Sequence, residues 1–160
     1  LEHKGLINEV IRHYRQWYME KDLEGTQFEP LFKNVKPVLK TLYQDGCSLG
    51  IATNKSLRGL NRGLLHHEIE KFFSIIMTTD DFTPKPDKAM AIHALRTLRV
   101  KNSAAFMIGD TVYDKKMGKN AKINTVGVTW GYNTEEVLHQ ENADYIINDP
   151  NELVEILKEL

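Results

Sequence analysis

Three short segments of the sequence carry side chains that suit the binding of phosphate or a divalent cation. The first, residues 51–56, reads Ile-Ala-Thr-Asn-Lys-Ser, so a hydroxyl and an amide follow an apolar run. Donors placed between the end of a strand and the start of a helix can bind a phosphate group. Thr53 and Asn54 are therefore candidate phosphate ligands, although the commoner role of Asn54 or Ser56 at such a place is to cap the helix.

The second segment, residues 83–87, reads Thr-Pro-Lys-Pro-Asp. Its two prolines hold Lys85 in a stiff turn ahead of a helix that Asp87 can cap. An exposed lysine is ordinarily only a solvated charge, but a restricted backbone lowers the entropy lost when its ammonium group is held in place. Lys85 is therefore a candidate fixed cation.

The third segment, residues 107–114, reads Met-Ile-Gly-Asp-Thr-Val-Tyr-Asp, so Asp110 and Asp114 follow an apolar strand. Alone, Asp110 would be an ordinary turn residue and Asp114 an ordinary helix cap. Two carboxylates four residues apart at the end of a buried strand instead favour a magnesium site.

The elements that position these segments alternate along the chain, which predicts an α/β fold with a doubly wound parallel sheet. The predicted helices span 35–45, 56–66, 87–98, 113–120, 134–140 and 150–159, and the predicted strands span 48–53, 74–78, 104–108, 124–129 and 144–147. In such a sheet the ligand site lies beyond the carboxyl ends of the strands, so polar residues that follow the apolar runs are the best candidates. A further amphipathic helix is predicted over residues 5–20, followed by a polar connector, with a domain boundary near residue 30.

The composition is that of an ordinary soluble domain, with 160 residues, 41% hydrophobic and 27% charged. A formal net charge of -1 gives no general attraction to nucleic acid or to a membrane surface. No apolar run has the length of a membrane span, and no secretory leader is visible, so secretion is not expected. The single Cys47 is predicted to be a buried or partly buried thiol, which fits a cytoplasmic protein.

A threonine after a strand, a lysine between prolines and a Gly-Asp-x-x-x-Asp segment, in this order, resemble the later motifs of the haloacid dehalogenase-like hydrolase superfamily. Residues 126–132, Val-Gly-Val-Thr-Trp-Gly-Tyr, and residues 143–147, Ala-Asp-Tyr-Ile-Ile, further resemble its phosphoglycolate phosphatase and pyrophosphatase branch. The resemblance implies a Rossmann-like core at 31–160, a helical cap remnant at 1–30, and magnesium-dependent hydrolysis of small phosphomonoesters.

The same resemblance assigns roles to residues of this sequence. It implies that Thr53 and Asn54 bind the transferred phosphoryl group and that Lys85 neutralises charge on the nucleophile and the phosphate. It also implies that Asp110 holds Mg²⁺, while Asp114 ligates or supports the metal. These roles agree with the chemistry, because phosphoryl transfer gains chiefly from positioned cations and hydrogen-bond donors.

The family's nucleophile, the first aspartate of an Asp-x-Asp-Gly-Thr motif, has no intact match. The nearest segment, residues 22–26, reads Asp-Leu-Glu-Gly-Thr and carries glutamate at the acid-base position. Residues 15–21 continue a helix stripe rather than a buried strand, so the similarity at Asp22 is interpreted as a decoy. The resemblance instead places the nucleophile strand upstream of Leu1.

In this family the missing strand lies between the strands that end at Thr53 and Ile108, so two inner sheet edges would lack a partner. Three hypotheses follow: direct pairing of the two strands, strand exchange between chains in a homo-oligomer, or an upstream segment of a longer protein. The leading functional prediction is a phosphatase that is inactive as this chain alone, acting on a small phosphorylated metabolite. The alternatives are a non-catalytic phosphate-binding or interaction module and a capless enzyme that uses Asp22.

Overall fold

The computed structural model describes residue 13 and residues 29–158, and the chain divides into two compact units, residues 1–30 and 31–160. Little of the first unit is described, so the predicted helix over residues 5–20 lies almost wholly outside the described residues, and Asp22 lies outside them as well. The account below concerns the second unit, which carries Thr53, Asn54, Lys85, Asp110 and Asp114.

The second unit alternates helices and strands throughout. Its helices are α2 (Val35–Gln44), α3 (Leu57–His67), α4 (Ala89–Leu98), α5 (Val112–Ala121), α6 (Glu135–Gln140) and α7 (Glu152–Lys158). Its strands are β1 (Leu49–Ala52), β2 (Phe73–Met77), β3 (Phe106–Gly109), β4 (Asn124–Val128) and β5 (Tyr145–Ile147). Short 3-10 turns, η1 (Glu70–Phe72) and η2 (Asn102–Ala104), precede β2 and β3. The predicted α/β fold with parallel strands is confirmed, and the predicted order of elements is correct.

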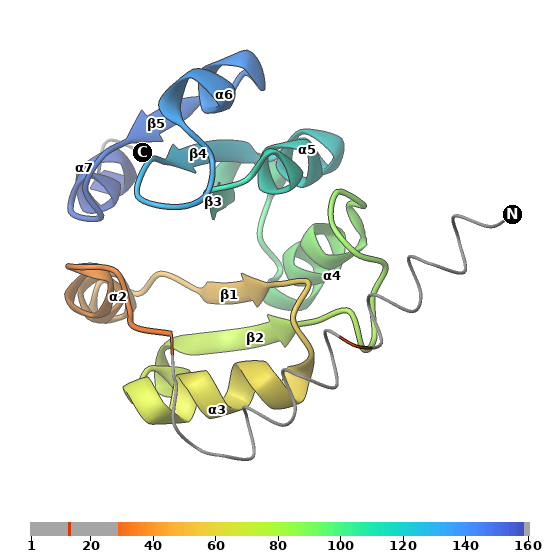
Figure 1. Cartoon of the computed structure of the whole chain (residues 1–160), viewed down its shortest axis with the longest axis vertical. Helices are drawn as coiled ribbons and strands as arrows, with labels where there is room; N and C mark the ends of the chain where they lie inside the picture. The colour runs from red at the N-terminus through yellow and green to blue at the C-terminus, as the bar shows by residue number, and fades with distance from the viewer. Residues whose placement is uncertain (1–12, 14–28, 159–160) are drawn as a thin grey trace, which may run out of the picture. The chain divides into compact units, whose positions relative to one another are not determined.

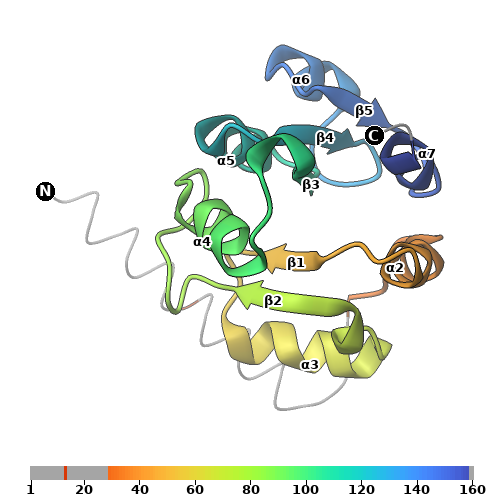
Figure 2. The same ribbon diagram turned by 180° about the vertical axis from the view of Figure 1, so that it is seen from behind.

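The strands form two parallel sheets rather than one. β1 pairs with β2, with Ile51 opposite Ile76, and β4 lies between β3 and β5, with Val126 opposite Ile108 and Tyr145. In both views β1 lies on the side of its sheet nearer to the second sheet (Figures 1 and 2). Within residues 31–158, β1 and β3 form no ladder with each other, so the hypothesis of direct closure is wrong.

The two sheets are joined by the helices that cover them. Val38 and Leu42 of α2 share a buried cluster with β4, β5 and Leu153 of α7. A second cluster joins Met77 at the end of β2 to Met90 of α4 and Met117 of α5. Because each cluster contains residues from both sides of the interrupted sheet, apolar burial holds the unit together where strand pairing is missing.

The burial of the strands reflects the break between the two sheets. β4, paired on both edges, is buried at every position after Asn124. β3, paired on one edge only, leaves the apolar side chain of Ile108 39% exposed. An apolar residue near the middle of a parallel strand is normally covered, so this exposure is what a missing neighbour strand predicts.

Cys47 is partly buried, as predicted, and burial raises the pKa of its thiol. Among the described residues, no helix is long and apolar enough to cross a membrane.

Candidate phosphate and metal site

The loop after β1 presents two hydrogen-bond donors. The Thr53 hydroxyl oxygen accepts the Lys55 N–H at 3.1 Å, which leaves the hydroxyl proton available. The Asn54 Oδ1 atom accepts the Lys85 N–H at 2.9 Å. Because that bond fixes the orientation of the amide, the Asn54 Nδ2 group remains as the outward donor.

The first turn of α3 is satisfied by other residues. The Ser56 hydroxyl oxygen accepts the Gly59 N–H at 3.4 Å, and the Asp80 carboxylate accepts the Leu57 N–H at 2.8 Å. Ser56 is therefore the helix cap, as one of the alternatives for this segment predicted, and Asn54 is not.

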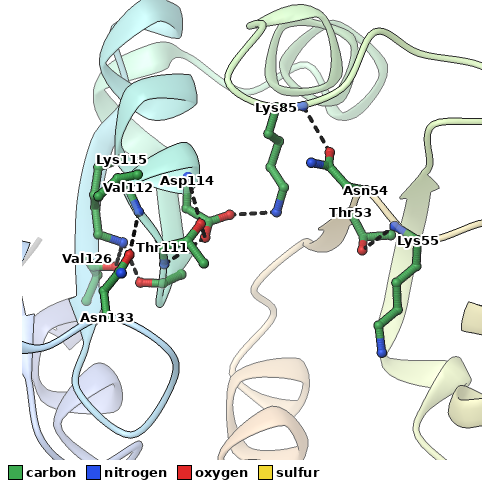
Figure 3. Close-up of polar contacts among 11 residues, drawn as sticks. Thr53, Asn54, Lys55, Lys85, Thr111, Val112, Asp114, Lys115, Val126 and Asn133 are labelled. Carbon is green, nitrogen blue, oxygen red and sulfur yellow. Dashed lines mark hydrogen bonds and ion pairs between the residues drawn. The ribbon is translucent and has the colours of Figure 1, made fainter. Parts of the chain in front are cut away.

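Lys85 is held at two points, and the residue after it at a third. Asn54 binds its N–H, Asn120 of α5 donates to the Pro86 carbonyl at 3.1 Å, and its ammonium group forms an ion pair with Asp114 at 2.6 Å. The Lys85 side chain is 14% exposed and extends across the site (Figure 3). Asp87 accepts the Ala89 N–H at 2.8 Å, but Lys88 rather than Asp87 occupies the N-cap position of α4, so the predicted cap is one residue out of place.

Asp114 has both carboxylate oxygens engaged. Oδ1 accepts from Lys85, whereas Oδ2 accepts the Thr111 N–H at 3.1 Å and the Thr111 hydroxyl at 2.6 Å. Thr111 caps α5 and Asp114 completes a reciprocal capping box, which sequence reasoning had not recognised. The packing also requires Gly109, because a Cβ there would lie 2.3 Å from the Asp114 Cγ atom.

Asp110 follows β3 directly and is fixed by the loop after β4. Its Oδ2 atom accepts the Tyr132 N–H at 2.9 Å, and its carbonyl accepts the Asn133 N–H at 3.2 Å. The loop passes so close that a Cβ on Gly131 would lie 2.2 Å from Asp110 Oδ2. Within the described residues Asp110 Oδ1 has no hydrogen-bond partner, so one hard oxygen remains for a cation.

Lys115, one residue beyond Asp114, is fully buried at 0% exposure. Its ammonium group donates to the Gly109 carbonyl. It also donates to the Val126 carbonyl at 3.0 Å (Figure 3). Burial lowers its pKa to about 8, opposed by the charges of Asp114 and Asp110. Sequence reasoning missed this residue, because Lys115-Lys116 in a helix has the pattern of a solvated pair. The structure shows how the side chain is accommodated: a Cβ on Gly127 would lie 3.3 Å from Lys115 Cε, so the glycine leaves room for the buried lysine.

The donor set fits a magnesium site that is only partly built from protein. Within residues 13 and 29–158, no group of three or more His, Cys, Asp and Glu side chains could hold a metal ion. Magnesium commonly keeps several waters and binds through one or two carboxylates together with phosphate oxygens. Asp110 suits one such ligand, whereas Asp114 already holds Lys85 and Thr111.

The structure thus connects the predicted residues in a chain of contacts, from Asn54 to Lys85 to Asp114 (Figure 3). Thr53 precedes this chain, and Asp110 lies one residue before the Thr111 cap. The roles of these residues in binding phosphate or metal stay predictions.

Comparison with known proteins accords with this geometry. Residues 1–128 match the model of the haloacid dehalogenase-like hydrolase family. The chain is 34% identical over 151 residues to pyrophosphatase PpaX of Bacillus velezensis, covering 93% of this chain and 68% of that protein. It is 31% identical over 154 residues to a phosphoglycolate phosphatase of Psychrobacter arcticus, covering 95% of this chain and 67% of that protein.

The fold is also found in solved structures. A haloacid dehalogenase-like hydrolase from Streptococcus pneumoniae superposes with a TM-score of 0.78 at 30% identity, covering 94% of this chain and 69% of that one. The chain thus spans about two thirds of the length of these relatives. Sequence and structure together show that it belongs to the haloacid dehalogenase-like hydrolase family, in the branch that contains phosphoglycolate phosphatases and PpaX pyrophosphatases.

Proposed function

We propose that this chain supplies the phosphoryl-binding and magnesium-binding part of a phosphatase that acts on small phosphomonoesters such as phosphoglycolate. The observation that carries the proposal is the contact chain in which Asn54 holds the Lys85 backbone and Asp114 holds the Lys85 ammonium group. It sets a fixed cation beside available amide and hydroxyl donors. A dianionic phosphoryl group is the ligand that such a set suits.

Each residue then has a distinct task. The Thr53 hydroxyl and the Asn54 Nδ2 group donate hydrogen bonds to phosphoryl oxygens. Lys85 neutralises phosphoryl charge, and Asp114 aims its ammonium group and keeps it from solvent. Asp110 would hold magnesium through Oδ1, and a magnesium ion so held would supply further charge neutralisation to the phosphoryl oxygens.

We infer that the nucleophile comes from outside the described residues, because neither aspartate of the site is free for that role. Asp114 has both oxygens committed, and Asp110 has one oxygen bonded to Tyr132 and the other assigned to the cation. We place the nucleophile on a strand that pairs with the open edges of β1 and β3. An upstream segment of a longer protein or a second copy of the chain would supply that strand, and a nucleophilic Asp22 is the competing idea.

The first test is phosphate binding by the purified chain, measured by ³¹P NMR titration with inorganic phosphate. Lys85→Ala should weaken binding roughly 10- to 100-fold, since a hydrogen bond to a charged group contributes about 1.5–3 kcal/mol. Lys101→Ala is the matched control, because Lys101 is an exposed lysine before η2, away from the contact chain. Equal affinity in the Lys85 variant would contradict the proposal.

The second test is magnesium-dependent hydrolysis of an aryl phosphate, with Asp110→Asn as the control for contaminating phosphatase. Activity that is lost in this control would show that a nucleophile is present, and Asp22→Asn would then ask whether it is Asp22. Phosphate binding without hydrolysis would favour the non-catalytic binding module or a chain that needs the missing strand. A synthetic strand peptide that restores turnover would separate those two cases.

A further inference from the structure

Lys115 is a buried cation that the proposed reaction does not use. It lies in the first turn of α5 behind the two aspartates, with a side chain that is fully inaccessible to solvent. Its ammonium group is solvated by two backbone carbonyls, one at the end of β3 and one in β4. Burying a charge is costly unless that charge is paired or hydrogen-bonded, and here the two carbonyls accept hydrogen bonds from it.

The charge of Lys115 is not neutralised by direct pairing. Of the residues described, none forms an ion pair with it, whereas the neighbouring Lys116 pairs with Glu141 at 3.2 Å. Lys115 nevertheless lies among other charges, because it follows Asp114 directly in α5 and its ammonium group donates to the carbonyl of Gly109, the residue before Asp110. Asp114 in turn pairs with Lys85, so the four charged groups are close neighbours. Two ammonium groups and two carboxylates sum to zero before any ligand arrives.

From this geometry we propose that Lys115 is a built-in counterion that favours phosphate over divalent cations at the site. Its field acts through the protein interior, where charge interactions are screened less than in water. A positive charge behind Asp110 weakens the attraction of that carboxylate for a metal ion and adds to the attraction for a phosphoryl anion. The inference deepens the proposed function and rests on it, since it concerns the same site.

A purely structural role makes a different prediction. If Lys115 only links the ends of β3 and β4 through the Gly109 and Val126 carbonyls, its loss displaces Asp110. Displacement would weaken the binding of both ions. Loss of charge instead shifts the two affinities in opposite directions, so paired measurements separate the explanations.

The experiment measures Mn²⁺ binding by electron paramagnetic resonance and inorganic phosphate binding by ³¹P NMR, each ion alone, at neutral pH. In Lys115→Met, Mn²⁺ binding should tighten and phosphate binding should weaken, each by roughly three- to tenfold. Lys116→Met removes an equal charge that is 50% exposed and should leave both affinities nearly unchanged. Affinities that fall together, or do not change, would overturn the inference.

A second variant guards against a simple folding defect. Lys115→Gln keeps a donor for the two carbonyls while removing the charge, and it should show the same opposed shifts. Circular dichroism verifies that each variant folds. If Lys115→Met does not fold, the result for Lys115→Gln decides the test. Wild-type protein that binds neither ion would contradict the proposed function itself, whereas wild-type binding with unopposed shifts contradicts only the role of Lys115.

Discussion

The segment after β3 and the segment after β1 are both parts of the site, yet they are held very differently. After β3, Asp114 and Lys115 are buried, and Asp110 is bound by the loop beyond β4. After β1, Thr53 is half-buried and Asn54 is exposed. The difference follows the strands. β3 lies beside β4, which is buried at every position after Asn124, whereas the partly buried β2 is the only partner of β1 among the described residues. The proposed metal-binding side is thus preorganised, while the proposed phosphate-binding side lies beside a β1 edge that has no partner strand among the described residues.

The largest expected contrast is in amide hydrogen exchange. Amides of β4 should exchange at least about 100-fold more slowly than the β1 amides that face away from β2. The β1 amides on that open edge can exchange without any opening of the unit, whereas those of β4 cannot. Mass spectrometry or NMR of the purified chain measures both strands together. Comparable protection at the two strands would mean that something already covers the inner edge of β1.

Lys85→Ala should break the contact between the two segments and lower the free energy of unfolding by about 3 kcal/mol, because it leaves the buried Asp114 carboxylate without its cation. Lys36→Ala is the matched control, since it removes an ion pair with Glu68 whose side chains are 45% and 78% exposed. Such an exposed pair contributes less than about 1 kcal/mol. Urea unfolding of both variants gives the two values, and equal losses would show that burial of Asp114 does not matter.

Two helix glycines test the packing difference directly. Gly118→Ala in α5 should destabilise by about 1–3 kcal/mol, since its Cβ would meet Thr125 Cγ2 at 2.5 Å and Met107 Cβ at 3.1 Å. Gly63→Ala in α3 has no atom within 4 Å of its Cβ, so helix propensity should stabilise it by up to about 1 kcal/mol. Thermal unfolding of both variants measures the two changes in stability. If both variants were destabilised, or both stabilised, the proposed difference in packing between α5 and α3 would be wrong.

The smallest expected effect concerns acid stability at the start of β5. Hydrogen bonds from Lys119 and Thr125 outweigh burial and keep the pKa of Asp144 below its ordinary value of 3.8. A lowered carboxylate pKa gives stability that is present above the unfolded pKa and is lost as the pH falls through the folded value. Wild type should therefore lose stability on acidification more steeply than Asp144→Asn, measured by unfolding midpoints across that range. Parallel pH profiles would show that these contacts do not favour the carboxylate.

Much of the fold could be predicted because its signals are local. Apolar periodicity located the elements of residues 35–158, and the order of the Thr53, Lys85 and Asp110 segments indicated the family. The break between β1 and β3 was foreseen only through the family resemblance, because strand pairing depends on residues far away in the chain. The double use of Asp114 and the burial of Lys115 were not foreseen. Each depends on which partners the tertiary structure brings within reach, and a pattern of residue types does not record that.

The open edges of β1 and β3 also affect how this chain behaves at high concentration. Most proteins shield the edges of their sheets, because exposed N–H and C=O groups recruit strands from other molecules. Among the described residues, β1 and β3 each lie at one end of their own sheet, and the edge that faces away from the partner strand is not paired. The purified chain should therefore self-associate as its concentration rises, and a peptide that fills the edges should return it to the monomer.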